Sequence, residues 1–163
     1  MEYERNIESM GNGLVMFDIS LKIKSNRYNY HIFYENGRKP PFDIAINPIT
    51  NIIEYVNFFL QDEKIITDKI INNIVFIENN IKIISSDFSE TNCEICRNKD
   101  IDIVIEGDII AAIDKNETGS LFGYKLNESN YVLLNSEMEI SGILLKDITS
   151  TELSGLKESA ALQ

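Results

Sequence analysis

The stretch IDIVIEGDIIAAI, residues 101–113, shows the pattern that decides the fold. Isoleucine occupies every second position in its first half, which is the period of a β-strand that buries one face. Gly107 and Asp108 supply a two-residue turn, and the apolar run 109–113 returns from it. These residues therefore predict a β-hairpin in the last third of the chain.

The same alternation of apolar and polar residues continues outward in both directions and predicts further short strands. They are expected at 17–23, 28–32, 42–46, 52–60, 74–76, 81–84, 121–126, 131–134 and 140–145. Turns rich in Asn, Pro and Gly separate several of them, so we expect hairpins over 14–35, 42–60 and 74–84. Short strands at this spacing predict a mainly β (β-rich α+β) fold, an antiparallel sheet curled into a sandwich or a partly open barrel.

Two segments lack the strand pattern and predict one or two short helices. Residues 62–72 place isoleucines at helical spacing. Thr149 or Thr151 is expected to cap a last helix that runs through Leu156. Residues 85–100 are polar and have no apolar period, so we expect an exposed loop there.

The chain is expected to form one domain. Its 163 residues are near the commonest domain size, and a hydrophobic share of 44% is enough for a core. We assign residues 1–156 to a single β-rich domain. Residues 157–163 are expected to be a flexible tail, either a frayed natural end or a remnant of cleavage by a protease that cuts after glutamine.

The charge of the chain limits the classes of partner. Lysine and arginine number 15 against 26 acidic residues, so the formal net charge is −11. Nucleic-acid binding through overall charge is not expected, because phosphate contacts need a basic surface. Both simple solubility and fast, electrostatically steered association with a basic protein are compatible with this charge.

Three features favour a cytoplasmic location. No stretch approaches the roughly 18 apolar residues of a membrane span, so no membrane contact is expected. The N-terminus, Met-Glu-Tyr-Glu-Arg, lacks the basic and apolar regions of a secretory signal. Cys93 and Cys96 are the only cysteines and lie too close together to close a long loop, so a secreted fold framed by disulfides is not expected.

Acidic residues cluster between residues 86 and 117, where Arg97, Lys99 and Lys115 are the only bases. We predict that these carboxylates bind a protein partner, with a merely solvated face as the alternative. The predicted partner-binding residues are Asp87, Glu90, Glu94, Asp100, Asp102, Glu106, Asp108, Asp114 and Glu117. Residues 114–120 also loosely resemble a calcium loop, but the twelfth position, which needs a bidentate glutamate, is Lys125.

Other residues with distinctive chemistry give weaker signals. Cys93 and Cys96 form one Cys-x-x-Cys pair, which is half of a zinc site, so they are weak metal candidates and no cofactor is expected. His31 is the only histidine, and no catalytic motif accompanies it, so a structural role is favoured over hydrolysis and no enzyme activity is predicted. Residues 22–39 mix basic and aromatic side chains, a pattern of single-strand nucleic-acid binding that the overall charge opposes.

Residues 42–64, FDIAINPITNIIEYVNFFLQDEK, resemble a hairpin of small bacterial immunity proteins, in which a strand enters an Asn-Pro-x-Thr-type turn and leaves through an apolar strand. The short, acidic chain is also similar to immunity proteins of polymorphic or contact-dependent toxin systems. This resemblance implies tight binding and masking of one cognate toxin, which we expect to be basic and of the nuclease type. The alternative is a small-ligand or carbohydrate-binding β-module, or a subunit of a larger assembly.

Overall fold

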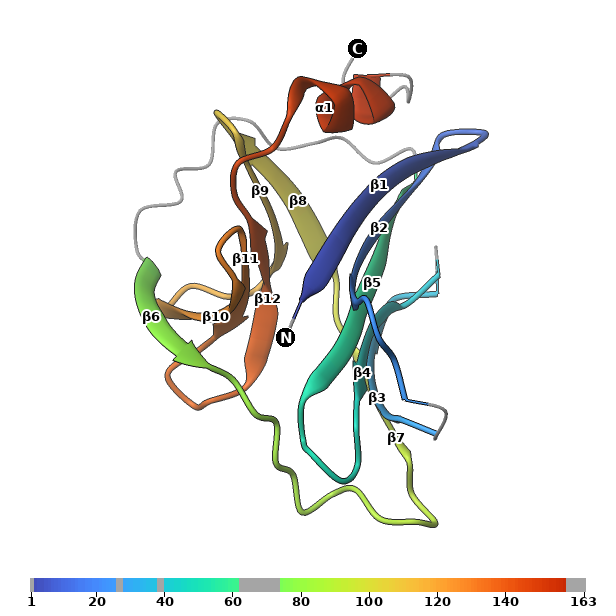
Figure 1. Ribbon diagram of the computed structural model, residues 1–163, viewed down its shortest axis with the longest axis vertical. Helices are drawn as coiled ribbons and strands as arrows, with labels where there is room; N and C mark the ends of the chain where they lie inside the picture. Colours follow the sequence, from blue (N-terminus) through green and yellow to red (C-terminus); the bar gives the residue numbers. More distant parts are fainter. Residues whose placement is uncertain (1, 26–27, 38–39, 62–73, 158–163) are drawn as a thin grey trace.

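The computed structural model of the protein describes residues 2–25, 28–37, 40–61 and 74–157. They form two β-sheets that pack face to face, with the helix α1 (Ser150–Lys157) at one end (Figure 1). The prediction of a mainly β fold is confirmed, and the sheets form an open sandwich rather than a closed barrel. Within the described part of the chain no helix has the length and apolar character needed to cross a membrane.

The first sheet, which we call sheet A, comes mostly from the first half of the chain. Its six strands follow the order β1 (Tyr3–Gly11), β2 (Leu14–Leu21), β5 (Ile53–Gln61), β4 (Phe42–Ile46), β3 (Tyr30–Glu35) and β7 (Glu94–Asn98). Neighbours are antiparallel except β3 and β7, which are parallel. One edge of sheet A is therefore supplied by a strand from the second half of the chain.

The second sheet, sheet B, contains the hairpin that the sequence predicts most clearly. Its six strands follow the order β6 (Ile74–Asn80), β10 (Leu121–Asn127), β11 (Asn130–Leu134), β12 (Ile140–Leu145), β9 (Ile109–Asp114) and β8 (Ile101–Glu106). The β8–β9 hairpin around Gly107 is confirmed. Because β6 and β10 are parallel, both sheets are mixed, which corrects the expectation of purely antiparallel pairing.

The main core lies between the two sheets. Side chains alternate along each strand, so every second residue of an inner strand faces the opposite sheet. Phe17 of β2 and Phe58 of β5 stack there with ring centroids 4.5 Å apart. The hydroxyl of Tyr34 on β3 donates a hydrogen bond of 2.7 Å to the carbonyl oxygen of Ile140 on β12. This bond connects sheet A directly to sheet B.

The predicted hairpin over 14–35 is wrong, although both of its strands exist. β2 pairs with β1 and β5, whereas β3 pairs with β4 and β7. The strand β1 was not predicted. It meets β2 through Gly11, Asn12 and Gly13, which all have positive φ, as tight hairpin turns require. This short turn makes β1 the nearest partner of β2, so β3 pairs elsewhere.

Two further predictions fail at the sheet edges. The expected hairpin over 74–84 is one strand, β6, which continues through polar residues 78–80, and 81–84 leave the sheet. The expected loop over 85–100 contains β7. β6 and β7 are edge strands that bury little of their surface, so polar residues are tolerated in them and the apolar period is lost.

The last helix agrees with its predicted start. The hydroxyl oxygen of Thr149 accepts a hydrogen bond from the backbone N–H of Glu152 at 3.2 Å, and the Glu152 carboxylate accepts one from the Thr149 N–H at 3.1 Å. This reciprocal pair is a capping box, which satisfies two donors at the start of α1. The predicted helix over 62–72 and the predicted tail beyond Lys157 lie outside the described residues.

Candidate functional site

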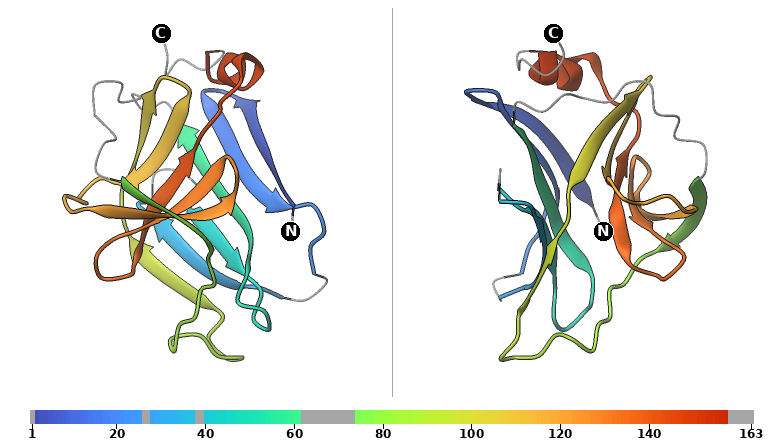
Figure 2. Two further views of the ribbon diagram at one scale, coloured as in Figure 1. Left: turned by 60° about the vertical axis from the view of Figure 1, so that its left-hand side comes forward. Right: turned by 180° about the vertical axis from the view of Figure 1, so that it is seen from behind.

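The outer face of sheet A points away from sheet B (Figure 2). It carries a cluster of hydrogen-bonded polar side chains. Ile32, Ile44 and Val56 belong to the core, so their strand neighbours face outward by alternation. These outward positions hold half-buried polar and aromatic side chains. Sheet A therefore has an apolar inner face and an outer face of polar and aromatic side chains.

The strand register brings three outward side chains together. His31 on β3 and Tyr55 on β5 both lie opposite Ala45 on β4. The small side chain of Ala45 leaves room for both rings to reach Asp43. Nδ1 of His31 lies 2.8 Å from Oδ1 of Asp43, and the Tyr55 hydroxyl donates to Oδ2 at 3.0 Å. One carboxylate thus fixes the rings of two neighbouring strands.

A second carboxylate extends this network to β2. Asp18 lies opposite Asn57 and accepts a hydrogen bond from its amide at 3.4 Å. The Ser20 hydroxyl donates to Asp18 at 2.9 Å. The Phe33 ring stacks on His31 with centroids 5.2 Å apart. We call the following side chains the outer-face patch: Asp18, His31, Phe33, Asp43, Tyr55 and Asn57.

Hydrogen bonding and burial in the outer-face patch shift two pKa values. The hydrogen bond with Asp43 raises the pKa of His31 above its ordinary value, although partial burial opposes the change, and Glu94 adds to the rise. Burial raises the pKa of Tyr55, and the Asp43 carboxylate raises it further. The Asp43 carboxylate therefore stabilises the charged form of the His31 imidazole and the neutral form of the Tyr55 phenol.

Carboxylates surround the outer-face patch on the same face. The described outward positions of the strands in sheet A include no lysine or arginine. Their carboxylates are Glu4, Glu8, Asp18, Glu35, Asp43 and Glu94. Lys24 follows β2 and places its Nζ 5.8 Å from the centroid of the Tyr55 ring. The face is therefore negative, with aromatic side chains at its centre.

His31 has an orienting carboxylate but lacks a nucleophile in contact. Asp43 is its one side-chain hydrogen-bond partner within the described parts of the chain. The Ser20 hydroxyl on this face donates to Asp18, and the Tyr55 hydroxyl donates to Asp43. A general base of the serine-hydrolase type needs the nucleophile within hydrogen-bond reach of its ring. The arrangement is therefore suited to holding side chains in place.

The His31–Asp43 pair predicts a titration result. In the variant Asp43→Asn, the pKa of His31 should fall toward its ordinary value of 6.5, because the charged partner is lost while burial still lowers the pKa. Histidine proton shifts in an NMR titration measure this directly. An unchanged midpoint would show that Asp43 does not hold the imidazole.

The same pair also sets a pH dependence of stability. Because the pKa of His31 is raised in the folded state, protonation of His31 stabilises the fold at a pH below its unfolded-state pKa. This stabilisation is lost as the pH rises through the folded-state pKa.

The predicted partner-binding acids do not share one surface. Glu94 lies on the outer face of sheet A at the start of β7. Glu90 belongs to the segment 81–93 and Asp108 to the β8–β9 turn, and these two segments lie at opposite ends of the molecule (Figure 1). Asp102 and Glu106 are in β8, and Asp87 lies beside the cleft between the sheets. The acidic segment is thus continuous in sequence but not in space.

Three of these acids are bound within the fold. Asp100 accepts a hydrogen bond from the Asn36 amide at 2.7 Å, and buried Asp114 lies 3.3 Å from Nζ of Lys99. Glu117 accepts hydrogen bonds from the Ser141 hydroxyl, the Asn135 amide and the Gly119 N–H. These bonds lower the pKa of Glu117 although burial raises it. The carboxylate oxygens of the calcium-like loop therefore accept hydrogen bonds from donors of the protein itself.

The two cysteines do not converge. Cys96 is in β7, and the Cys93 carbonyl just before it accepts a hydrogen bond from the His31 N–H at 2.8 Å, which continues the β3–β7 ladder. Residues three apart on an extended strand point to opposite faces. Nor does any group of three or more candidate metal ligands exist among the residues described.

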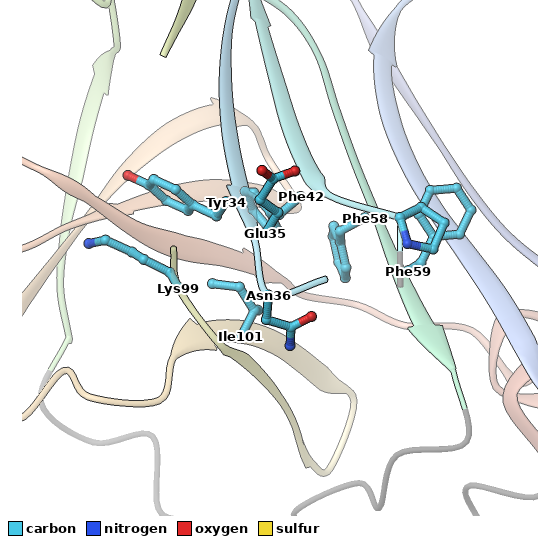
Figure 3. A pocket seen from close by; sticks show the side chains of 9 residues that line it. Tyr34, Glu35, Asn36, Phe42, Phe58, Phe59, Lys99 and Ile101 are labelled. Atoms are coloured by element: carbon cyan, nitrogen blue, oxygen red, sulfur yellow. The ribbon is translucent and has the colours of Figure 1, made fainter. Parts of the chain in front are cut away.

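The pocket in Figure 3 is filled by the protein itself. Phe42, Phe58 and Phe59 crowd one side of it, and its free volume is about 10 Å³. A volume of this size is near the lower limit for a single water molecule. The pocket therefore has no room for a small-molecule ligand.

Sequence patterning missed most of the outer-face patch, although a signal existed. Asp43, Tyr55 and Asn57 are polar or amphipathic residues at alternate positions of strands that are otherwise apolar, within residues 42–64. Alternation identifies their common face, but only the register shows that they meet. No protein-family model matches the chain, and no curated protein matches it significantly in sequence.

Proposed function

We propose that this protein is a binding protein that masks a basic protein partner with the outer face of sheet A, as an immunity protein masks its toxin. The observation that carries the proposal is the charge of this face. Among the described strand positions that point outward, carboxylates surround the outer-face patch without lysine or arginine. Such a face is complementary to the basic surface with which a nuclease holds phosphates.

The aromatic side chains are suited to anchor the partner. Phe33, Tyr55 and His31 are half-buried on a solvent-facing sheet, so each still offers surface to a partner. Aromatic residues in the centre of an interface provide a large share of binding energy. Their hydrogen bonds and stacking hold them in place before binding, which lowers the entropy cost of association.

The surrounding carboxylates are suited to a different task. Exposed charges contribute little to the lifetime of a complex, but they attract an opposite charge and accelerate its association. Glu4 and Glu94 are exposed on opposite edge strands, β1 and β7. They therefore extend the negative field across the width of sheet A.

The test combines capture of a partner with two charge-matched variants. Tagged protein captures partners from its source organism, and a purified basic partner is then measured by surface plasmon resonance. The variant Glu4→Lys/Glu94→Lys should slow association about tenfold or more and weaken its dependence on salt. The control, Asp108→Lys/Glu137→Lys, changes the net charge equally at exposed turns of sheet B and should leave association nearly unchanged.

A third variant separates anchoring from steering. Phe33→Ala removes an aromatic anchor and should mainly accelerate dissociation, weakening binding about tenfold or more. The proposal fails if the captured partner is acidic. It also fails if the Asp108→Lys/Glu137→Lys control slows association as strongly as the outer-face variant.

A further inference from the structure

A cleft of about 510 Å³ lies between the two sheets, on the inner side of sheet A. Ile32 and Ile95 line it from β3 and β7, and Tyr124, Leu134 and Ile140 line it from sheet B. The segment 80–85 borders it as the chain leaves β6. This volume is within the range of about 300–1,000 Å³ that is typical of small-molecule sites.

Apolar side chains at the rim of the cleft remain uncovered. Ile84 is 79% exposed and Met138 is 62% exposed, and both line the cleft. Large apolar residues next to a concave, mostly apolar surface indicate a place where a ligand can bury further apolar area. Ile81 and Ile83 of the same segment pack against the core, which fixes the position of this wall.

Cations gather at the cleft although the chain is strongly acidic. Lys82, Arg97 and Lys99 line it, together with the acids Asp87 and Glu139. Arg97 alternates with outward-facing Cys96 on β7, so its side chain is on the inner side of the sheet. Its guanidinium donates to the Cys96 carbonyl at 3.2 Å, and no carboxylate of the described residues forms an ion pair with it.

Lys99 and Tyr34 connect the cationic part of the cleft to its apolar part. Nζ of Lys99 lies 5.0 Å from the centroid of the Tyr34 ring, and Figure 3 shows both side chains directed away from Phe58 and Phe59. Burial raises the pKa of Tyr34 to about 12, Glu139 and Asp114 add to the rise, and Arg97 opposes it. The Arg97 charge is therefore close enough to act on the same region.

We infer that the cleft binds a small amphipathic anion, a molecule with an apolar chain and one carboxylate or similar acidic head. The chain lies against Ile32, Ile95 and Leu134, and the head pairs with Arg97. This site is on the opposite face of sheet A from the outer-face patch, so it is independent of the proposed partner binding.

The experiment uses octanoate and 1-octanol as matched probes in calorimetric titrations of the whole protein. Octanoate should bind about tenfold or more tightly than 1-octanol, because a charge-assisted contact adds to the same apolar burial. In Arg97→Gln this preference should disappear. In Lys22→Gln, which removes an equal charge from an exposed pair with Glu2, the preference should remain.

Two outcomes would overturn the inference. One is equal affinity for the two probes, or no binding of either, in the wild-type protein. The other is an undiminished preference for octanoate in Arg97→Gln. Both variants replace exposed residues, so folding is expected to be retained, and circular dichroism checks it. Partner capture by the Arg97→Gln variant shows separately whether the outer face still functions.

Discussion

Replacement of Gly142 by alanine is expected to destabilise the protein by about 4 kcal/mol or more, among the largest effects of a single substitution. Gly142 lies in β12, and its φ of +158° directs the side-chain position toward the neighbouring strand β9. A Cβ there would overlap the carbonyl oxygen of Ala112 and lie 3.0 Å from Cα of Ile113. Backbone atoms in a central strand cannot move aside without breaking the ladder.

Urea unfolding measured by circular dichroism determines the loss, and Gly123→Ala is its control. Gly123 lies in β10 of the same sheet, and a Cβ there would lie 3.1 Å from Cδ1 of Phe76. The Phe76 side chain is 40% exposed and can shift, so the control should lose about 1 kcal/mol or less. Equal unfolding midpoints for Gly142→Ala and the wild type would contradict the close approach of β12 and β9.

Replacement of Arg5 by methionine is expected to cost about 2–4 kcal/mol, because it removes the cation from a largely buried ion pair. Nε and Nη2 of Arg5 donate to the two carboxylate oxygens of Glu152 at 2.7 and 2.9 Å. Nη1 donates to Oδ1 of Asn130 at 3.0 Å and to the Lys146 carbonyl at 2.9 Å. One guanidinium therefore joins β1, β11, the end of β12 and α1.

The dependence of the free energy of unfolding on pH, measured at acidic pH, identifies the cause of this loss. Burial raises the pKa of Glu152, but the hydrogen bonds from Arg5 and Thr149 outweigh it and lower the pKa below 4.5. Because the pKa of Glu152 is lowered in the folded state, its ionised carboxylate stabilises the fold at a pH above the unfolded-state pKa. This stabilisation is lost as the pH falls through the folded-state pKa. The Arg5→Met variant should show a weaker acid dependence than the wild type.

A surface pair supplies the matched control for Arg5. Lys22 lies 2.9 Å from Glu2, but the two side chains are 53% and 76% exposed. Exposed pairs contribute about 0–1 kcal/mol, so Lys22→Met should change stability little. If Arg5→Met and Lys22→Met lost the same free energy of unfolding, the attachment of α1 through Arg5 would be refuted.

The sequence predicts the strands that bury a regular apolar face, including the edge strand β8, and misses the two edge strands of sheet A. Strands such as β5 and β12 bury one or both faces, so their apolar residues recur and identify them. In β7 only Ile95 is a half-buried apolar residue, and β1 places Arg5 at an inward position. Neither strand shows a clear apolar period, although each makes a complete ladder with its neighbour.

The candidate site was less accessible to sequence reasoning than the fold. His31 was singled out as the only histidine, but its partner Asp43 comes from another strand, and nothing local predicts their contact. The acidic cluster of residues 86–117 is continuous along the chain, yet strands that belong to both sheets divide it among different surfaces. The pairing of distant strands determines which side chains come into contact, and a short window of residues does not encode that pairing.

The parallel strand β7 also has a consequence for the order of folding. β1 with β2, and β8 with β9, are neighbours in sequence and need only short loops to close. β7 pairs with β3 although their partner residues, such as His31 and Glu94, are 63 positions apart, so a large entropy of loop closure is lost before this pair gains any contact. We therefore expect the two sheets to nucleate from local hairpins, with β7 joining late and its amide protons exchanging with solvent earliest among the strands of sheet A.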